Sequence, residues 1–255
     1  MRQNRCFGAF IFKEAFMDTV KFNKKSVKMV AHRGVSGLER ENTNAAFVAA
    51  GNRSYFGIET DVHVTKDEKF IIHHDDTVFR LTGVSDVYIE QTNYEDLKKL
   101  YLTEGLDVKR RDMIMPDLED YISICKKYEK IAVLEIKNRM ETKHLKKITE
   151  IIDSMEYLDG TIFISFSWEN CTDLRKLLPN AKIQFLCSKW DDELLLNLKN
   201  NNLDLDIHFR ALTAEIVQKL HENEIEVNCW TVDSPEDAER LASFGVDYIT
   251  SNILE

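Results

Sequence analysis

Short β-rich runs recur along this chain, and helical patterns separate most of them. The runs lie at residues 27–31, 57–64, 70–73, 131–136, 161–166, 182–187, 203–207, 225–232 and 247–249. Apolar periodicity favours helices over residues 42–52, 117–128, 142–155, 168–178, 191–200, 213–223 and 234–244. Strands that alternate with helices are typical of parallel βα units. A single TIM-type (β/α)8 barrel uses ~250 residues, and this chain has 255.

Two segments fit this barrel less simply. The sequence has nine such runs, whereas the barrel has eight strands. Only residues 65–69 separate the second run from the third. Because parallel strands need a crossover of about a dozen residues, the chain either descends there in extended form or turns back as a hairpin. Residues 76–116 have weak periodicity, which indicates a small insertion. We expect a barrel domain over residues 27–255 and an N-terminal extension over residues 1–26, in which Met17 is an alternative start.

Charge and cysteine content narrow the class of protein. The net charge of −10 disfavours nucleic-acid binding, which needs basic stripes, and docking on anionic membranes by charge. The five cysteines are widely spaced with no C-x-x-C pair, so we expect reduced thiols, no zinc site and a cytoplasmic protein. No apolar run approaches the ~20 residues of a membrane span. Nothing in the pattern indicates an oligomeric state.

Charged and titratable residues follow or end four of the apolar runs. They are His32, Arg33, Glu59, Asp61, His74, Glu135 and Lys137. The carboxyl ends of parallel strands form the active face of a barrel, so we expect these side chains to converge there. Residues at i and i+2 of a strand share a face. Glu59 therefore points the same way as Asp61, and Glu135 the same way as Lys137.

These residue types together favour phosphate-ester cleavage. Clustered carboxylates with no nearby thiolate suit a hard divalent cation, Mg²⁺ or Ca²⁺. Arg33 and Lys137 add the positive charge that matches phosphate oxygens. Two histidines can serve as base and acid, since imidazole titrates near neutral pH.

Several neighbouring residues have a simpler interpretation. His63 and Asp75 are taken as structural, although His63 shares the face of Glu59 and Asp61, so a site role for it stays open. His73 should face away from its neighbour His74, so only one of the two belongs in the site. Trp230 fits either the core or a wall of the ligand site.

The ordered motifs of the chain resemble the glycerophosphodiester phosphodiesterase family from about residue 28 to residue 253. The matching stretches are Ala31-His32-Arg33-Gly34, Glu41-Asn42-Thr43, Ile58-Glu59-Thr60-Asp61-Val62, Thr65-Lys66-Asp67, His74-Asp75, Arg80-Leu81-Thr82-Gly83, Met115-Pro116-Asp117-Leu118-Glu119, Leu134-Glu135-Ile136-Lys137, Ser165-Phe166, Trp230-Thr231-Val232 and Gly245-Val246-Asp247-Tyr248-Ile249-Thr250. So many motifs in order are highly specific.

The resemblance implies a barrel related to phosphatidylinositol-cleaving phospholipases and a role in lipid and glycerol metabolism. It implies a divalent metal on Glu59, Asp61 and Glu135, with His32 and His74 as the acid/base pair. Arg33 and Lys137 would bind the phosphate. The implied reaction converts a glycerophosphodiester and water into glycerol 3-phosphate and an alcohol. We expect one imidazole to activate the glycerol 2-hydroxyl and the other to protonate the leaving alcohol, through a cyclic phosphate.

The chain departs from the family pattern at two places. Arg40 stands where proline usually precedes Glu-Asn-Thr, and Ser251-Asn252 follows Thr250 where the family usually reads Thr-Asp. We expect these changes to affect loop shape and substrate fit and to leave the proposed metal, base and acid untouched. Two other activities stay open. One is a lysophospholipase D, with an acyl groove supplied by residues 76–116, and the other is a non-catalytic phosphodiester-binding module.

Overall fold

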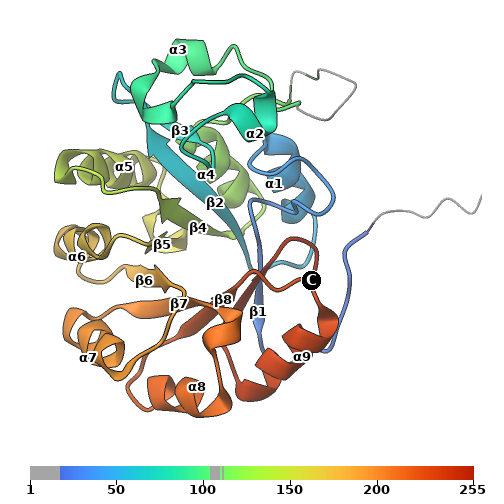
Figure 1. Ribbon diagram of the computed structural model, residues 1–255, viewed down its shortest axis with the longest axis vertical. Helices are drawn as coiled ribbons and strands as arrows, with labels where there is room; N and C mark the ends of the chain where they lie inside the picture. Colours follow the sequence, from blue (N-terminus) through green and yellow to red (C-terminus); the bar gives the residue numbers. More distant parts are fainter. Residues whose placement is uncertain (1–17, 104–109, 111) are drawn as a thin grey trace, which may run out of the picture.

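Eight parallel strands close into a barrel in the computed structural model, which describes residues 18–103, 110 and 112–255 (Figure 1). The barrel strands are β1 (Lys28–Ala31), β2 (Gly57–Val64), β4 (Ile131–Ile136), β5 (Thr161–Ser165), β6 (Lys182–Cys187), β7 (Asp204–His208), β8 (Val227–Trp230) and β9 (Tyr248–Ser251). Each pairs with the next, and β1 pairs with both β9 and β2. The closed barrel that the sequence predicts is therefore confirmed.

The ninth run forms a hairpin outside the barrel. Strand β3 (Phe70–Ile72) pairs antiparallel with the end of β2, so that Val62 lies opposite Ile72. The turn is held by Thr65, whose backbone N–H donates to the Lys69 carbonyl at 2.8 Å and whose hydroxyl donates to Asp67 at 2.7 Å. The hairpin alternative is correct, because five residues are too few for a crossover between parallel strands.

Helices cover the outside of the barrel (Figure 1). They are α1 (Asn44–Gly51), α4 (Leu118–Lys127), α5 (Thr142–Ser154), α6 (Trp168–Leu177), α7 (Asp192–Asn201), α8 (Ala214–His221) and α9 (Pro235–Phe244), with single 3₁₀ turns η2 (Leu158–Gly160) and η3 (Phe209–Ala211). Capping side chains define several helix starts. Ser234, for example, accepts a hydrogen bond from the Asp237 amide at 3.3 Å, and Pro235 occupies the first turn. No helix among the described residues combines the length and the apolar character that a membrane crossing requires.

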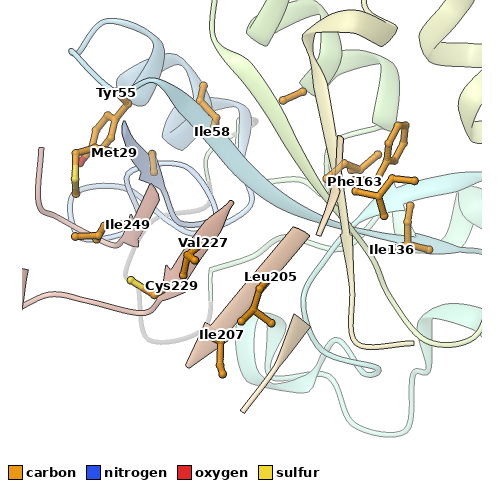
Figure 2. Packing of buried hydrophobic residues seen from close by; sticks show 14 of the residues in the cluster. Met29, Tyr55, Ile58, Ile136, Phe163, Leu205, Ile207, Val227, Cys229 and Ile249 are labelled. Carbon is orange, nitrogen blue, oxygen red and sulfur yellow. The ribbon is translucent and has the colours of Figure 1, made fainter. Parts of the chain in front are cut away.

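Two apolar layers pack against the strands, because alternate side chains point to opposite faces. The layer between strands and helices is the larger, and Figure 2 shows part of it, including Ile58, Phe163 and Leu205. A smaller cluster, which includes Val30, Ile164 and Leu186, lies on the opposite face of the strands, inside the barrel.

Residues between β3 and α4 form short elements with a buried cluster of their own. The elements are α2 (Phe79–Thr82), η1 (Ile89–Gln91) and α3 (Tyr94–Leu97). The cluster consists of Ile71, Val78, Leu81, Ile89, Leu97, Leu102 and Met115. These elements lie at the top of Figure 1, beside the strand ends. We propose that this segment, 76–116, is an insertion into the barrel domain.

The chain before β1 is described only from residue 18, so residues 1–17, with the alternative start Met17, lie outside the described part. Val20 forms a parallel bridge with Leu254, and its amide donates to the Ile253 carbonyl at 3.0 Å. The Glu255 carboxylate contacts Lys21 at 2.8 Å. Residues 18–26 of the proposed N-terminal extension therefore lie against the last residues of the chain.

Candidate active site

A cavity of about 140 Å³ opens at the carboxyl ends of the barrel strands. It is lined by His32, Arg33, Glu59, His74, Glu135, Ile164, Phe166, Leu186, Asp206, Trp230, Thr231 and Thr250. A larger cavity of about 370 Å³ lies at the opposite end of the barrel, around Lys28 and Lys182, where TIM barrels carry stability rather than catalysis. The smaller cavity, at the carboxyl ends of the strands, is lined by most of the site residues that the sequence predicts.

Three carboxylates meet beside this cavity. One oxygen from each of Glu59, Asp61 and Glu135 lies within 4.8 Å of the others, and all three side chains are buried. Strand pairing explains the meeting, because Asp61 of β2 is in register with Glu135 of β4. Glu59 follows from the two-residue repeat of β2.

The electrostatics of this carboxylate triad match a divalent cation. Burial and the neighbouring charge of Asp61 raise the pKa of Glu59 well above its usual range and that of Glu135 to about 7. Burial alone would raise the pKa of Asp61. The charges of Lys137, His74 and Arg33 outweigh this effect and hold that pKa below its usual range. Asp61 Oδ1 is buried without a hydrogen-bond partner. An oxygen-only donor set of three crowded, buried carboxyl groups fits Mg²⁺ or Ca²⁺.

Asn42 positions the triad, although sequence reasoning gave it no role. Its Nδ2 donates to Asp61 Oδ2 at 2.8 Å, and its Oδ1 accepts from the Thr60 hydroxyl at 2.7 Å. The residue is buried with φ of +53°, a conformation that asparagine tolerates better than most residues. The only sequence signal was its place in the Glu41-Asn42-Thr43 motif.

His32 is oriented through its Nδ1 atom, which lies 2.7 Å from Asn252 Oδ1. The Asn252 amide donates from Nδ2 to Asp233 at 2.6 Å, so its oxygen faces the ring and His32 donates from Nδ1. The other ring nitrogen of His32, Nε2, faces Glu59 and lies 4.0 Å from its Oε2 atom. Burial and the charge of Arg33 lower the pKa of His32 to about 4, so its Nε2 is an unprotonated base at neutral pH.

This contact corrects one expectation. The departure from the family pattern at Ser251-Asn252 was expected to leave base and acid untouched. Asn252 instead contacts His32 directly. Because β9 and β1 are adjacent strands, residues that follow their ends become neighbours, which residue spacing alone did not reveal.

His74 faces the same cavity and is held by the adjacent carboxylate. Its Nδ1 donates to Asp75 Oδ1 at 2.7 Å, and Arg80 donates from Nε to the other oxygen of Asp75 at 2.6 Å. Burial lowers the pKa of His74, while the charges of Asp61 and Asp75 oppose that change. Sequence reasoning took Asp75 as structural and missed its contact with this imidazole.

The other two histidines of this region do not line the cavity. His73 Nε2 lies 3.1 Å from the Thr77 carbonyl. His63 is buried, and its Nδ1 lies 3.3 Å from Glu90 Oε1 of η1.

Two cationic side chains flank the carboxylate triad. Arg33 Nη1 donates to Glu41 at 2.8 Å, while its Nε is buried without a hydrogen-bond partner. Lys137 Nζ lies 2.8 Å from Glu135 Oε1 and 3.5 Å from Asp61 Oδ1. Burial alone would lower the pKa of Arg33 and of Lys137. The Asp61 carboxylate outweighs this effect and raises the pKa of both side chains. Both therefore stay charged beside the cavity.

The far wall of the cavity is apolar and aromatic. Trp230 packs edge-to-face against Phe166, with ring centroids 5.6 Å apart, and against His208 at 5.3 Å. Ile164 and Leu186 complete this wall. The cavity can thus hold an ionic group on one side and carbon atoms on the other.

Comparison with known proteins gives a consistent match. The model of the glycerophosphoryl diester phosphodiesterase family matches residues 32–254. A glycerophosphodiester phosphodiesterase of Caldanaerobacter subterraneus subsp. tengcongensis is 29% identical over 235 residues, which cover 88% of this chain and 93% of that protein. The crystal structure of a glycerophosphodiester phosphodiesterase from Thermotoga maritima aligns with a TM-score of 0.71 and 25% identity, over 89% of this chain and 94% of that one.

A third similar protein shows the same fold at lower identity. It is a phosphodiesterase of Oleispira antarctica, solved in complex with the product sn-glycerol-3-phosphate. It aligns with a TM-score of 0.81 and 23% identity, over 92% of this chain and 96% of that one.

Proposed function

The chain belongs to the glycerophosphoryl diester phosphodiesterase family, and from this premise we propose that the protein binds glycerophosphodiesters in this cavity. It hydrolyses them to glycerol 3-phosphate and an alcohol by metal-dependent histidine catalysis. Membership makes the protein a phosphoric diester hydrolase, the enzyme class that the sequence predicts. The observation that carries the finer proposal is the meeting of three carboxylates, two imidazoles and two cations around one cavity.

Glu59, Asp61 and Glu135 would hold the cation, which we propose to be Mg²⁺ or Ca²⁺. When bound, such an ion supplies neutralising charge for the phosphodiester and polarises its oxygens. Arg33 would donate from its guanidinium to a phosphate oxygen, and Lys137 would contribute a second positive charge. These roles require no rearrangement of the strands.

The two histidines would divide the proton transfers. Unprotonated His32 Nε2 takes the proton of the glycerol 2-hydroxyl, whose oxygen attacks phosphorus. The bond from phosphorus to the alcohol oxygen breaks, and protonated His74 gives that oxygen a proton. Intramolecular attack avoids the entropy of bringing in a second reactant. Water then opens the cyclic phosphate with the two roles reversed, which yields glycerol 3-phosphate and restores both imidazoles.

The first test is a coupled assay for glycerol 3-phosphate over a panel of diesters with Mg²⁺, Ca²⁺ or Mn²⁺. We expect activity on glycerophosphocholine or another water-soluble diester, and loss of that activity with chelator. Release of glycerol 3-phosphate from none of the diesters under any metal would refute the proposal.

Histidine substitutions test the proposed roles. We expect His32→Ala and His74→Ala to keep the fold and to lower kcat at least 100-fold, because general acid–base catalysis contributes roughly 10²–10⁴-fold. His221→Ala is the matched control, since this half-exposed histidine on α8 pairs with Asp247 far from the cavity. Full activity after either cavity substitution would remove that histidine from the mechanism.

The apolar wall favours a second substrate class, lysophospholipids. Phe166 is 49% exposed at the cavity, and Phe79 of α2 is 57% exposed on the segment proposed as an insertion. Such surfaces suit an acyl chain. Assays of glycerophosphocholine against lysophosphatidylcholine separate the two activities, and binding of either without release of product would support a non-catalytic module.

A further inference from the structure

Asp206 is a buried carboxyl in the cavity that the proposed mechanism does not use. It lies on β7, is 2% exposed, and lines the cavity together with His32 and Glu135. Its Oδ2 accepts a hydrogen bond from Asn228 Nδ2 at 3.2 Å. Its Oδ1 is buried and has no hydrogen-bond partner. Buried polar atoms are rarely left unpaired, so this oxygen calls for an explanation.

The protein around Asp206 does not supply the missing partner. Among the described residues, no basic side chain forms an ion pair with it. Lys137 is bound to the carboxylate triad, and Arg33 to Glu41. Ile164 and Leu186 line the cavity with Asp206 and offer only carbon. The unpaired oxygen therefore belongs to a residue that lines the cavity and that its protein neighbours leave unsatisfied.

A second unpaired polar atom occurs on the neighbouring strand. Trp230 of β8 lines the same cavity, and its indole Nε1 is buried without an acceptor. Strands β7 and β8 are paired, with His208 in register with Trp230. Two residues that line the cavity thus carry an unused acceptor and an unused donor. A hydroxyl group donates and accepts at once, whereas a quaternary ammonium does neither and an ester cannot donate.

We propose that Asp206 accepts a hydrogen bond from the free primary hydroxyl of the substrate's glycerol unit and so selects glycerol that is not acylated there. The proposal rests on the proposed function. In that reaction the 2-hydroxyl contacts a histidine, and the phosphate contacts the cationic side chains. The primary hydroxyl is then the one polar group of the glycerol that has no partner. The hydroxyl would donate its proton to Asp206 Oδ1, whereas an ester oxygen has no proton to donate.

The consequence concerns the choice between the two proposed substrate classes. A lysophospholipid acylated at the primary position has an ester there and cannot donate to Asp206. Sites built around a substrate hydroxyl reject analogues that lack it, because the buried partner is left unpaired. Asp206 would therefore disfavour lysophospholipids even though the lining residues on the neighbouring strands β6 and β8, Leu186 and Trp230, are apolar or aromatic.

The kinetic test compares Asp206→Ala and Asp206→Asn with a matched control, Asp204→Asn. Asp204 lies on the same strand two residues earlier, does not line the cavity, and accepts from the Glu226 amide at 2.9 Å. With glycerophosphocholine we expect Asp206→Ala to raise KM about 10- to 100-fold with a smaller change in kcat. With 1-acyl lysophosphatidylcholine, kcat/KM should stay unchanged or rise. Asp206→Asn should be intermediate, and the control should match the wild type.

A binding test does not depend on turnover. Calorimetry in Mg²⁺ buffer would compare sn-glycerol 3-phosphate with its analogue that lacks the primary hydroxyl. The wild type should bind the complete ligand at least tenfold more tightly, and Asp206→Ala should bind the two equally while circular dichroism reports an intact fold.

The inference is overturned if the wild type binds both ligands equally or if Asp206→Ala keeps the wild-type preference. Absence of glycerol 3-phosphate release by the wild type would instead refute the proposed function. The calorimetric comparison would still decide whether Asp206 recognises the hydroxyl.

Discussion

At the scale of single residues, the two imidazoles of the cavity differ in what holds their Nδ1 atoms. His32 donates to the neutral amide of Asn252, whereas His74 donates to the carboxylate of Asp75. A carboxylate partner stabilises an imidazolium, and an amide does so much less. This difference supports the assignment of His32 as the first base and His74 as the first acid.

The pH profile tests this assignment. Asp75 favours the charged form of His74, so Asp75→Asn should lower the pKa of His74. Because the acid must be protonated, activity falls as pH rises through that pKa. We therefore expect the alkaline limb of kcat/KM for glycerophosphocholine to move to lower pH by about one pH unit.

Asp76→Asn is the control for this profile, because Asp76 is the adjacent carboxylate and bonds to Asn138 rather than to a histidine. An alkaline limb that stays in place in Asp75→Asn would contradict the role of His74 as the acid.

At the scale of elements, the turn after β1 places His32 and Arg33, two residues of the proposed site, through its backbone geometry. Arg33 and Gly34 have φ of +53° and +74°, and the Arg33 amide donates to Glu59 Oε2 at 2.8 Å. A Cβ atom on Gly34 would lie 2.6 Å from the Ala46 carbonyl carbon in α1. The turn can therefore keep its close approach to α1 only with glycine at this position.

Substitution of this glycine tests the role of the turn. Gly34→Ala should lower the free energy of unfolding by roughly 1–3 kcal/mol and also lower kcat/KM, because the strained turn carries His32 and Arg33. The control is Gly245→Ala, whose φ is +88° but whose Cβ would meet no atom within 4 Å. We expect the control to lose stability in urea unfolding and to keep wild-type kcat/KM. Equal activity of the two variants would show that the turn does not position the site.

At the scale of the whole molecule, the barrel was predictable because its strands are buried on both faces. Such strands appear as continuous apolar runs, and polar residues at their ends stand out. His32, Glu59, Asp61 and Glu135 were therefore visible in the sequence as site candidates. The loop between β2 and β3 was too short for a crossover, which left the hairpin as one of two alternatives, and the antiparallel pairing of the strands decides for it.

Other parts of the molecule had no periodic signal. The helices α2 and α3 have four residues each, so packing rather than periodicity determines them. Asn252 contacts a histidine that only the closed barrel brings near, and residue spacing did not show which way the Asp75 carboxylate turns toward the adjacent His74. Asp206 lies inside a strand, where it breaks the apolar pattern. Only the three-dimensional arrangement shows what these polar groups contact.

At this scale the proposed metal site would also couple metal affinity to pH, since β2 and β4 bring its carboxylates close together. Burial and the charge of Asp61 raise the pKa of Glu135 to about 7, so a cation must displace a proton below that pH. Because burial also raises the pKa of Glu59 well above its usual range, we expect Mg²⁺ affinity to fall more than tenfold per pH unit below pH 7, with more than one proton released. Calorimetry in two buffers of different protonation enthalpy measures the number of protons released.

Glu135→Gln should bind Mg²⁺ much more weakly than the wild type. The control is Glu68→Gln, which removes an exposed carboxylate paired with Lys143 and should bind Mg²⁺ as the wild type does. Proton-independent binding by the wild type would argue that Glu135 is not a ligand.

Anomalous diffraction from crystals soaked with Mn²⁺ tests the central claim most directly. We predict one strong peak at the carboxyl ends of β2 and β4, about 2.0–2.6 Å from one oxygen each of Glu59, Asp61 and Glu135, and its loss in Asp61→Asn. A peak bound by other residues, or no peak near these three carboxylates, would contradict the account of the site.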